Sequence, residues 1–167
     1  DLFRKDRNIV IGLSSATPQP FWSARGKIGG KQLENLEKLL KKNTDSFRCV
    51  VLHHPVARNF CARRKQLIDA ENLASLLTEY RVELVLHGHL HRNKEYFLGS
   101  ETRVYSISSA SSASVDKPSC YRIFDIEEKE GGYRVETTLK TGFLMGGDAV
   151  TSLSDSWAVE RARSLKG

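Results

Sequence analysis

The sequence has few of the residues that define several large classes of protein. Of 167 residues only 3 are cysteine and 4 are proline, and aromatic residues make up 8%. The longest purely apolar runs are a few residues long, such as Cys49-Val50-Val51-Leu52, so no segment spans a bilayer and no membrane partner is expected. Glycine and charge contents are those of ordinary globular proteins, which excludes a collagen, a disordered tail and a coiled coil.

The chain also lacks a recognisable start. It begins with Asp1 rather than Met, and its first six residues have no apolar core of the kind that a signal peptide needs. Such a beginning suggests a processed or truncated product. The length is sufficient for one domain and short for two.

The three cysteines, Cys49, Cys61 and Cys120, cannot all pair within one chain, and no CxxC motif occurs. Reduced thiols in the cytoplasm are the simplest interpretation. The net charge is +6, from 26 basic and 20 acidic residues, which could favour anionic partners. The basic residues are scattered along the chain without interleaved aromatics, so nucleic acid is not favoured as a partner, although it is not excluded.

The first half of the chain alternates between strand and helix patterns. Apolar segments of strand length lie at 8–13, 48–53 and 83–87, and residues with helical spacing lie between them at 33–40 and 69–80. This βαβαβ order with short connections predicts a parallel sheet covered by helices.

The pattern changes after residue 91. Segments 94–98 and 103–107 flank a Gly-Ser turn, and segments 121–126 and 133–139 flank a polar turn, which predicts two antiparallel hairpins. The predicted fold class is therefore α/β, with parallel strands followed by antiparallel hairpins.

The end of the chain carries a weaker pattern. The stretch 108–114 consists of small residues and is typical of a loop, and 141–155 is rich in glycine and serine. We therefore expect one domain over residues 1–145 and a C-terminal tail over 146–167, with a short helix possible at 157–165.

The five histidines form two clusters, His53-His54 and the sequence His87-Gly88-His89-Leu90-His91. Each cluster lies where a predicted parallel strand ends. Ligands of α/β sheets bind beyond the carboxyl ends of the strands, so the two clusters should converge on one site. Imidazole is the commonest metal ligand, and Gly88 would permit a sharp turn that aims His89 and His91 at a common centre.

The histidines also admit a purely structural interpretation. Positions 87, 89 and 91 alternate, as the polar face of a strand would, and a short motif alone often matches by chance. A zinc finger is not predicted, because no cysteine lies at the required spacing from the histidines. A serine hydrolase is not predicted either, because no GxSxG sequence follows a strand.

The histidine sequences resemble those of the calcineurin-like metallophosphoesterases. That family has a histidine often followed by x-Pro, as in His53-His54-Pro55, and later a G-H-x-H motif, as in Gly88-His89-Leu90-His91. The segment Gly29-Gly30-Lys31-Gln32-Leu33 also looks like a helix start in bacterial members of the family. The resemblance covers about residues 8–140 and keeps the order of the motifs.

The resemblance implies that part of the family's site is missing. The motifs D-x-H, G-D-x-x-D and G-N-H-[DE] do not occur before Asn8. By resemblance, the chain is the C-terminal half of a four-layer α/β/β/α sandwich. The N-terminal half would have been removed, or it would be supplied by another chain, and it is then the expected partner.

The resemblance also implies a binuclear metal centre. His53 and His89 match ligands of one metal and His91 matches a ligand of the other. Two divalent ions (Mn, Fe or Zn) in the complete domain would clamp the phosphate and lower the pKa of a water between them. Without the carboxylates of the missing motifs, this chain alone would bind no metal or one ion weakly.

Neighbouring residues receive lesser roles. His54 could support a ligand, face the substrate or be exposed, and His87 is expected to pack or hydrogen-bond behind the ligands. Arg58, Arg63 and Arg64 could meet a substrate phosphate, although a solvated loop is the simpler interpretation.

The expected function is metal-dependent hydrolysis of phosphomonoesters or phosphodiesters, with this chain supplying half of the site and inactive alone. The alternative is a non-catalytic fragment or interaction module that binds metal weakly or not at all. The strands at 9–13 and 50–52 have the pattern of strands buried on both faces, so we also expect an apolar face that binds the missing half or a second copy.

Overall fold

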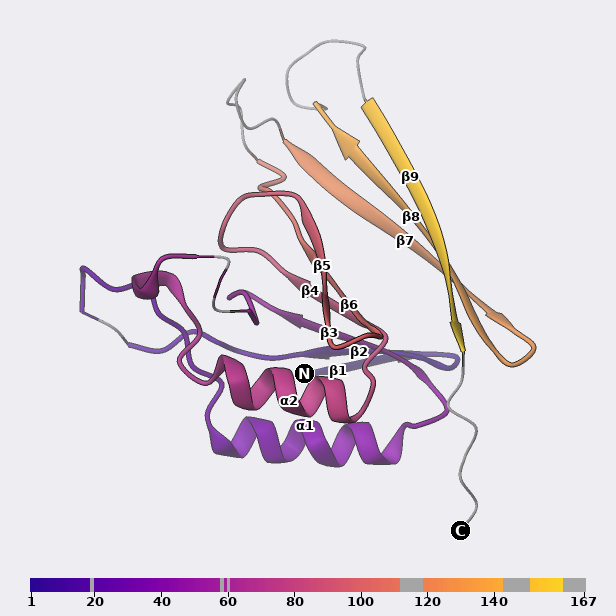
Figure 1. The fold of residues 1–167 in the computed structure, drawn as a ribbon, viewed down its shortest axis with the longest axis horizontal. Helices are drawn as coiled ribbons and strands as arrows, with labels where there is room; N and C mark the ends of the chain where they lie inside the picture. Colours follow the sequence, from indigo (N-terminus) through magenta and orange to yellow (C-terminus); the bar gives the residue numbers. More distant parts are fainter. Residues whose placement is uncertain (19, 58, 60, 112–118, 143–150, 161–167) are drawn as a thin grey trace. The chain divides into compact units, whose positions relative to one another are not determined.

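The computed structural model describes residues 1–167 except 19, 58, 60, 112–118, 143–150 and 161–167 (Figure 1). The chain divides into two compact units, Asp1–Ser108 and Ser109–Gly167. The predicted α/β class is confirmed, with parallel strands first and antiparallel strands last. In the described part of the chain, neither helix has the length and apolar character needed to cross a membrane.

The first unit is built on a six-stranded sheet with the order β1-β2-β3-β4-β6-β5. Its four central strands run parallel, and the short strands at both edges run antiparallel to their neighbours. The strands are β1 (Leu2–Lys5), β2 (Asn8–Gly12), β3 (Phe47–Leu52), β4 (Leu84–His87), β5 (Lys94–Leu98) and β6 (Thr102–Ser106).

Two helices, α1 (Gly30–Lys42) and α2 (Ala70–Glu79), lie side by side on one face of this sheet (Figure 1). The apolar stripe of each helix faces the sheet, as its spacing predicts, and buries Leu36 and Leu40 of α1. A short 3₁₀ helix, η2 (Arg63–Lys65), precedes α2. Burial of these stripes against Ile, Val and Leu side chains of the strands forms the core of the unit.

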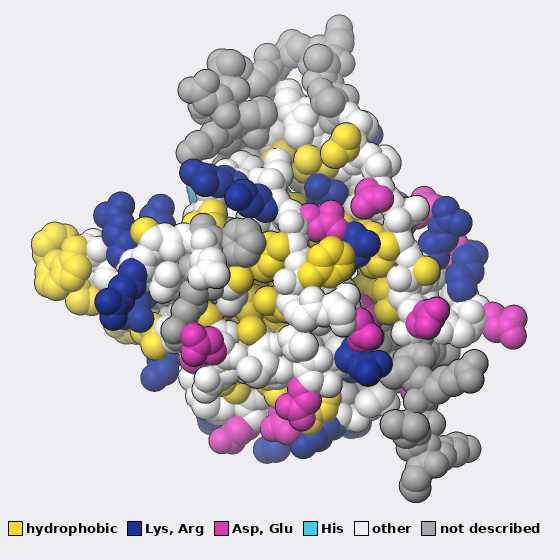
Figure 2. All heavy atoms as spheres, in the orientation of Figure 1, with side chains coloured by type: hydrophobic (Ala, Val, Ile, Leu, Met, Phe, Trp, Pro, Cys, Tyr) yellow, Lys and Arg dark blue, Asp and Glu magenta, His cyan; other side chains and the backbone are white. Residues whose placement is uncertain are grey.

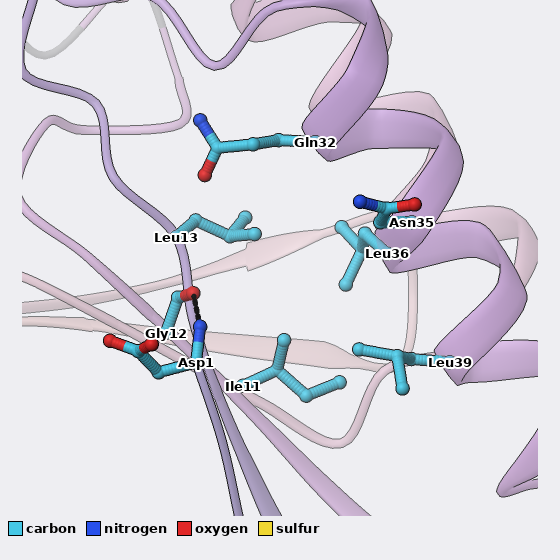
Figure 3. Close-up of a pocket in the computed structure, with 8 residues that line it drawn as sticks. All are labelled: Asp1, Ile11, Gly12, Leu13, Gln32, Asn35, Leu36 and Leu39. Atoms are coloured by element: carbon cyan, nitrogen blue, oxygen red, sulfur yellow. Dashed lines mark hydrogen bonds between the residues drawn. The ribbon is translucent and has the colours of Figure 1, made fainter.

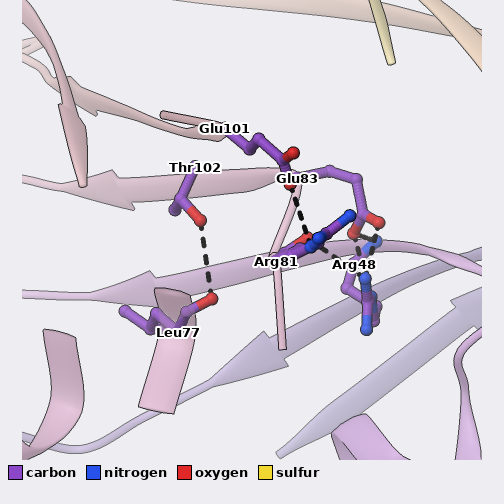
Figure 4. A network of polar contacts seen from close by, with 6 residues as sticks. All are labelled: Arg48, Leu77, Arg81, Glu83, Glu101 and Thr102. Carbon is purple, nitrogen blue, oxygen red and sulfur yellow. Dashed lines mark hydrogen bonds and ion pairs between the residues drawn. The ribbon is translucent and has the colours of Figure 1, made fainter. Parts of the chain in front are cut away.

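A buried ion pair joins the starts of β3 and β4. Arg48 and Glu83 have side chains that are 7% and 10% exposed, and their charged groups lie 2.7 Å apart (Figure 4). The Glu83 carboxylate accepts two bonds from the guanidinium and one from the backbone N–H of Arg48, and Arg48 also donates to the Arg81 carbonyl. This arrangement satisfies both charges, which burial would otherwise penalise.

The second unit is a three-stranded antiparallel sheet with the order β7-β8-β9. Its strands are β7 (Cys120–Lys129), β8 (Gly132–Thr141) and β9 (Thr151–Glu160), so the second predicted hairpin is present with longer strands. The expected helix at 157–165 is wrong for residues 157–160, which belong to β9. Trp157 and Val159 alternate with exposed neighbours, which is the pattern of a strand, and β9 pairs with β8 along its whole length.

Three other features of the first unit differ from expectation. The sequence does not predict β1, because its four residues are all exposed and carry no burial pattern. The first hairpin exists, but β6 also pairs in parallel with β4 and so extends the main sheet. β2 is not buried on both faces: Ile9 and Ile11 are buried, whereas Val10 is 36% exposed. The alternation of side chains along a strand places Val10 on the sheet face opposite to Ile9 and Ile11.

Candidate metal centre

The carboxyl ends of β3 and β4 lie next to each other and carry both histidine clusters. Leu52, the last residue of β3, pairs with His87, the last residue of β4. Just beyond, the backbone N–H of Gly88 donates to the carbonyl of His53 over 3.2 Å. The parallel pairing therefore brings two distant stretches of sequence to one edge of the sheet, as expected for ligand sites in such folds.

Three imidazole rings gather at this edge. The ring centroids of His53, His54 and His89 lie 4.5–5.1 Å from one another. Nδ1 of His89 is 2.9 Å from Nε2 of His53, which is a hydrogen bond in which one of the two nitrogens donates. His91 is exposed and follows His89 by two residues.

The backbone at His89 and His91 adopts the left-handed conformation, with φ of 63° and 48°. This region is uncommon for residues with a Cβ and costs free energy, so it persists only where the surroundings impose it. The turn that Gly88 was expected to provide is thus made at the histidines themselves. Beyond the turn, the loop is held by Ser108, whose hydroxyl donates to the carbonyl of His91 over 3.2 Å.

His54 is buried, 6% exposed, which excludes the exposed alternative. Its Nε2 is 3.0 Å from the carbonyl oxygen of Ala24, which can only accept, so Nε2 carries the proton. Nδ1 then accepts from the hydroxyl of Ser15 at 2.7 Å. Both nitrogens are therefore used within the protein, and His54 supports the site without a free lone pair for a metal.

His87 is also buried, with both ring nitrogens in hydrogen bonds. It is 4% exposed, its Nδ1 is 3.2 Å from the carbonyl of Gly88, and its Nε2 is 2.9 Å from the hydroxyl of Tyr96 on β5. Because a carbonyl cannot donate, Nδ1 carries the proton and Nε2 accepts from Tyr96. His87 is thus buried with both ring nitrogens engaged, and its supporting role behind metal ligands stays a prediction.

Burial keeps these imidazoles neutral. It lowers the pKa of His87 from 6.5 to about 4, and it lowers the pKa of His54 as well. Burial, together with repulsion from the neighbouring histidines, lowers the pKa of His89 to about 4. The neutral imidazole is the form that binds metals, so His89 needs no deprotonation near pH 7 to bind one.

The arrangement fits the imidazole part of a metal centre. Nε2 of His89 is buried and has no hydrogen-bond partner in the described structure, which is costly unless a further group binds it. Of the three predicted ligands, His53 and His89 lie together, whereas His91 is exposed and its ring is not among the three that gather here, so its role as a ligand stays a prediction. Among the residues that the structure describes, however, no three His, Cys, Asp or Glu side chains are already placed to enclose one.

The basic residues expected near a phosphate occupy the segment before α2. Arg63 and Arg64 are exposed in η2, and Arg58 lies outside the described residues.

A shallow pocket elsewhere is lined by α1 and the end of β2, with Asp1, Leu13 and Gln32 around it (Figure 3). No histidine lines this pocket.

The sequence did not indicate the groups that hold the two supporting histidines. Ser15 and Ala24 come from the loop after β2, and Tyr96 comes from β5. Only the contact of Ser15 had a signal in the sequence: Ser15 comes just after a buried strand, and the ends of parallel strands meet at one edge of the sheet. The contacts of Ala24 and Tyr96 depend on long-range packing that no local pattern indicates.

Comparison with known proteins identifies the type of fold and a relative. No protein-family model matches the chain. A structure of GAP50, described as the anchor in the inner membrane complex of Plasmodium, matches 98% of this chain and 53% of its own with a TM-score of 0.53 and 15% identity. A dimetal phosphatase from Danio rerio matches 82% of this chain and 40% of its own with a TM-score of 0.49 and 14% identity.

Among curated proteins, the chain is similar to the 3',5'-cyclic adenosine monophosphate phosphodiesterase CpdA of Haemophilus influenzae. The two are 28% identical over 120 residues, which are 70% of this chain and 42% of the relative. The predicted resemblance to the calcineurin-like metallophosphoesterases is thereby confirmed. The chain spans less than half of the length of this curated relative.

Proposed function

We propose that the chain contributes one part of a binuclear metal site that hydrolyses phosphomonoesters or phosphodiesters. The observation that carries the proposal is the histidine cluster at the ends of β3 and β4, where Nε2 of His89 is buried without a partner in the described structure. The similarity to a relative named as a cyclic nucleotide phosphodiesterase supports the reaction class.

His53, His89 and His91 are proposed to hold divalent ions (Mn, Fe or Zn), and His54 and His87 to position them. Divalent metals, when bound, stabilise charge on phosphate oxygens and lower the pKa of water. Imidazoles alone do not bridge two such ions, so the carboxylate ligands are proposed to come from outside these 167 residues. That remaining part of the site is the proposed partner, and the chain alone is proposed to be inactive.

The test compares residues 1–167 with the longest polypeptide that the gene encodes. Metal affinity is measured by calorimetry with Zn²⁺ and Mn²⁺, and turnover is measured with bis(p-nitrophenyl) phosphate. We expect turnover from the longer polypeptide only, and at least tenfold weaker metal binding in His89→Ala, about 1.4 kcal/mol. Lys94→Ala, an exposed residue of β5, is the control and should bind metal as the wild type does.

Three results would contradict the proposal. Equal metal affinity in the wild type and His89→Ala would remove the ligand assignment. Chelator-sensitive turnover by residues 1–167 alone would show that no outside carboxylate is required. Metal binding that is absent from both polypeptides would favour the alternative, a non-catalytic interaction module.

We also propose a cytoplasmic location. All three cysteines, Cys49, Cys61 and Cys120, are free thiols, and two of them are buried. Reducing compartments keep such thiols unpaired. Alkylation with a membrane-impermeant maleimide in intact cells would label Cys61 only if the chain were exported.

A further inference from the structure

The loop between β2 and α1 carries two exposed aromatic side chains. Phe21 is 97% exposed and Trp22 is 66% exposed, and their rings meet edge to face with centroids 4.7 Å apart. Figure 2 shows a hydrophobic projection at the left-hand edge of the molecule, where Figure 1 places this loop. Exposing two large aromatics to water gains nothing in folding, and adjacent exposed aromatics mark interaction sites.

The base of this loop is fixed to the segment that contains η2. The N–H of Ala24 donates to the carbonyl of Arg64 over 2.9 Å, and the N–H of Gly26 donates to the carbonyl of Gln66 over 3.2 Å. The carbonyl of Gly26 accepts in turn from the N–H of Ile68 at 2.8 Å. Two segments that are distant in sequence, 24–27 and 63–68, are therefore paired close to the aromatic residues in the chain, and we call this paired region the ledge.

This ledge is basic on both sides. No acidic residue occurs between Asp6 and Glu34 or between Asp45 and Asp69. The basic residues that the structure describes around the pairing of the two segments are Arg25, Lys27, Arg63, Arg64 and Lys65. None of these five side chains forms an ion pair with another described residue. Dark blue side chains lie beside the hydrophobic projection in Figure 2.

We propose that the Phe21–Trp22 pair and this basic ledge dock the protein on an anionic lipid bilayer. Tryptophan favours the interface between headgroups and acyl chains, and two aromatics can enter it while the backbone beneath stays hydrated. Cations near the surface are attracted to anionic headgroups, each strengthening binding about fivefold. The expectation of no membrane partner rested on the lack of a spanning segment, and peripheral docking requires none.

The geometry of the rings favours a bilayer over single-stranded nucleic acid. Nucleic acid binding uses successive aromatic platforms on which bases stack along a groove. Here the two rings are inclined at 83° and pack against each other. A compact wedge of this kind suits insertion into an interface better than a series of stacked bases.

The proposal goes beyond phosphoester hydrolysis and does not depend on it. The loop is nevertheless in contact with the candidate metal centre, because Nε2 of His54 donates to the carbonyl of Ala24 over 3.0 Å. Docking through Trp22, which lies close to Ala24 in the same loop, would hold the histidine cluster close to the membrane surface. The histidine cluster would then act on substrates located at that membrane surface.

The test measures binding to lipid vesicles and requires no catalysis. The 167-residue chain is floated with vesicles of phosphatidylcholine containing about 30% phosphatidylserine, and with pure phosphatidylcholine as a comparison. Trp157→Phe leaves Trp22 as the only tryptophan, so its emission reports insertion. We expect binding to the anionic vesicles, a blue shift of Trp22 emission, and weaker binding as salt rises from about 50 to about 500 mM, since salt screens exposed charges.

Substitutions assign the binding to the patch. Phe21→Ser with Trp22→Ser should weaken vesicle binding at least tenfold, and Arg63→Glu with Arg64→Glu should abolish the salt dependence. Phe3→Ser is the matched control, because Phe3 is 64% exposed on β1 and lies outside the basic ledge. Circular dichroism confirms that each variant is folded.

Several results would overturn the proposal. These are no binding of the wild type to anionic vesicles, or equal losses in Phe3→Ser and in the double aromatic variant. A shift of Trp22 emission with single-stranded oligonucleotide but not with vesicles would assign the patch to nucleic acid instead. A shift that grows with protein concentration alone would assign it to a second copy of the chain.

Discussion

Gly26 lies directly against the ring of His54, and its replacement by alanine tests whether this contact positions the histidine cluster. A Cβ at position 26 would be 2.4 Å from Nδ1 of His54 and 2.7 Å from two of its ring carbons. Ordinary contacts of such atoms begin near 3.4 Å, so the ring would have to move by about 1 Å. The ring is buried and hydrogen-bonded at both nitrogens, to Ser15 and Ala24, and therefore has little room to do so.

The expected cost follows from these constraints. Overpacking a buried site costs about 1–3 kcal/mol, and loss of one or both hydrogen bonds of His54 adds about 1 kcal/mol each. Alanine also lowers the conformational entropy of the unfolded chain relative to glycine, which stabilises the folded protein by about 0.4–1 kcal/mol. We expect Gly26→Ala to lower the free energy of unfolding by about 2 kcal/mol and the midpoint of thermal unfolding by about 4–8 °C.

Denaturant unfolding followed by circular dichroism measures this change. Gly30→Ala is the matched control: Gly30 is the first residue of α1 and nothing lies within 4 Å of its added Cβ. It should be neutral or stabilising by a few tenths of a kcal/mol. In a His54→Ala background the clash is removed, so Gly26→Ala should then cost less than about 0.5 kcal/mol. Equal costs of Gly26→Ala with and without the His54 ring would show that this contact does not position the histidine.

Three further predictions concern buried polar groups. Glu83→Ala, which leaves Arg48 buried without its partner, should destabilise by about 3–5 kcal/mol in denaturant unfolding, whereas Arg48→Met with Glu83→Leu should cost far less. Cys61, half-buried, should react with Ellman's reagent in the folded protein at about pH 8, whereas burial raises the pKa of Cys49 to about 12 and should delay its reaction until unfolding. Because burial lowers the pKa of His87 from 6.5 to about 4, the unfolded chain binds a proton between these pH values and the folded chain does not, so stability should fall as pH drops from 6.5 towards 4, with His87 contributing at most about 3 kcal/mol. The lowered pKa values of His54 and His89 act in the same direction, so His87→Gln should make the decline shallower without removing it, and an unchanged pH profile would contradict the contribution of His87.

Periodicity predicted the elements that pack against other elements, and it failed where side chains are exposed. The spacing of Leu36 and Leu40 identified α1 because both face the sheet. β1 has no buried residue, so nothing in its sequence marks it as a strand, and its structure comes from pairing with β2. The end of β9 has a sequence compatible with a helix because its two partly buried residues, Trp157 and Val159, give too short a pattern.

The convergence of the histidines was predictable for a general reason. His53 and His89 each follow a strand that the βαβ order makes parallel, and the carboxyl ends of parallel strands share one edge. The turn geometry was not predictable: Gly88 was expected to supply it, whereas positive φ occurs at His89 and His91. The conformation of a loop depends on what holds it, here Ser108 just after β6, and that contact is remote in sequence.

Neighbouring histidines differ in role because the fold buries one of each cluster more deeply than the other. At the end of β3, His54 points into the protein and is buried, while the adjacent His53 is exposed. At the end of β4, His87 is buried with both nitrogens engaged, while Nε2 of His89 has no partner in the described structure. Each cluster thus supplies one histidine whose hydrogen bonds fix it in the fold and at least one with a nitrogen left for a ligand. Because the fixed rings carry their proton on a nitrogen facing a carbonyl, they cannot exchange roles with the others without breaking those bonds.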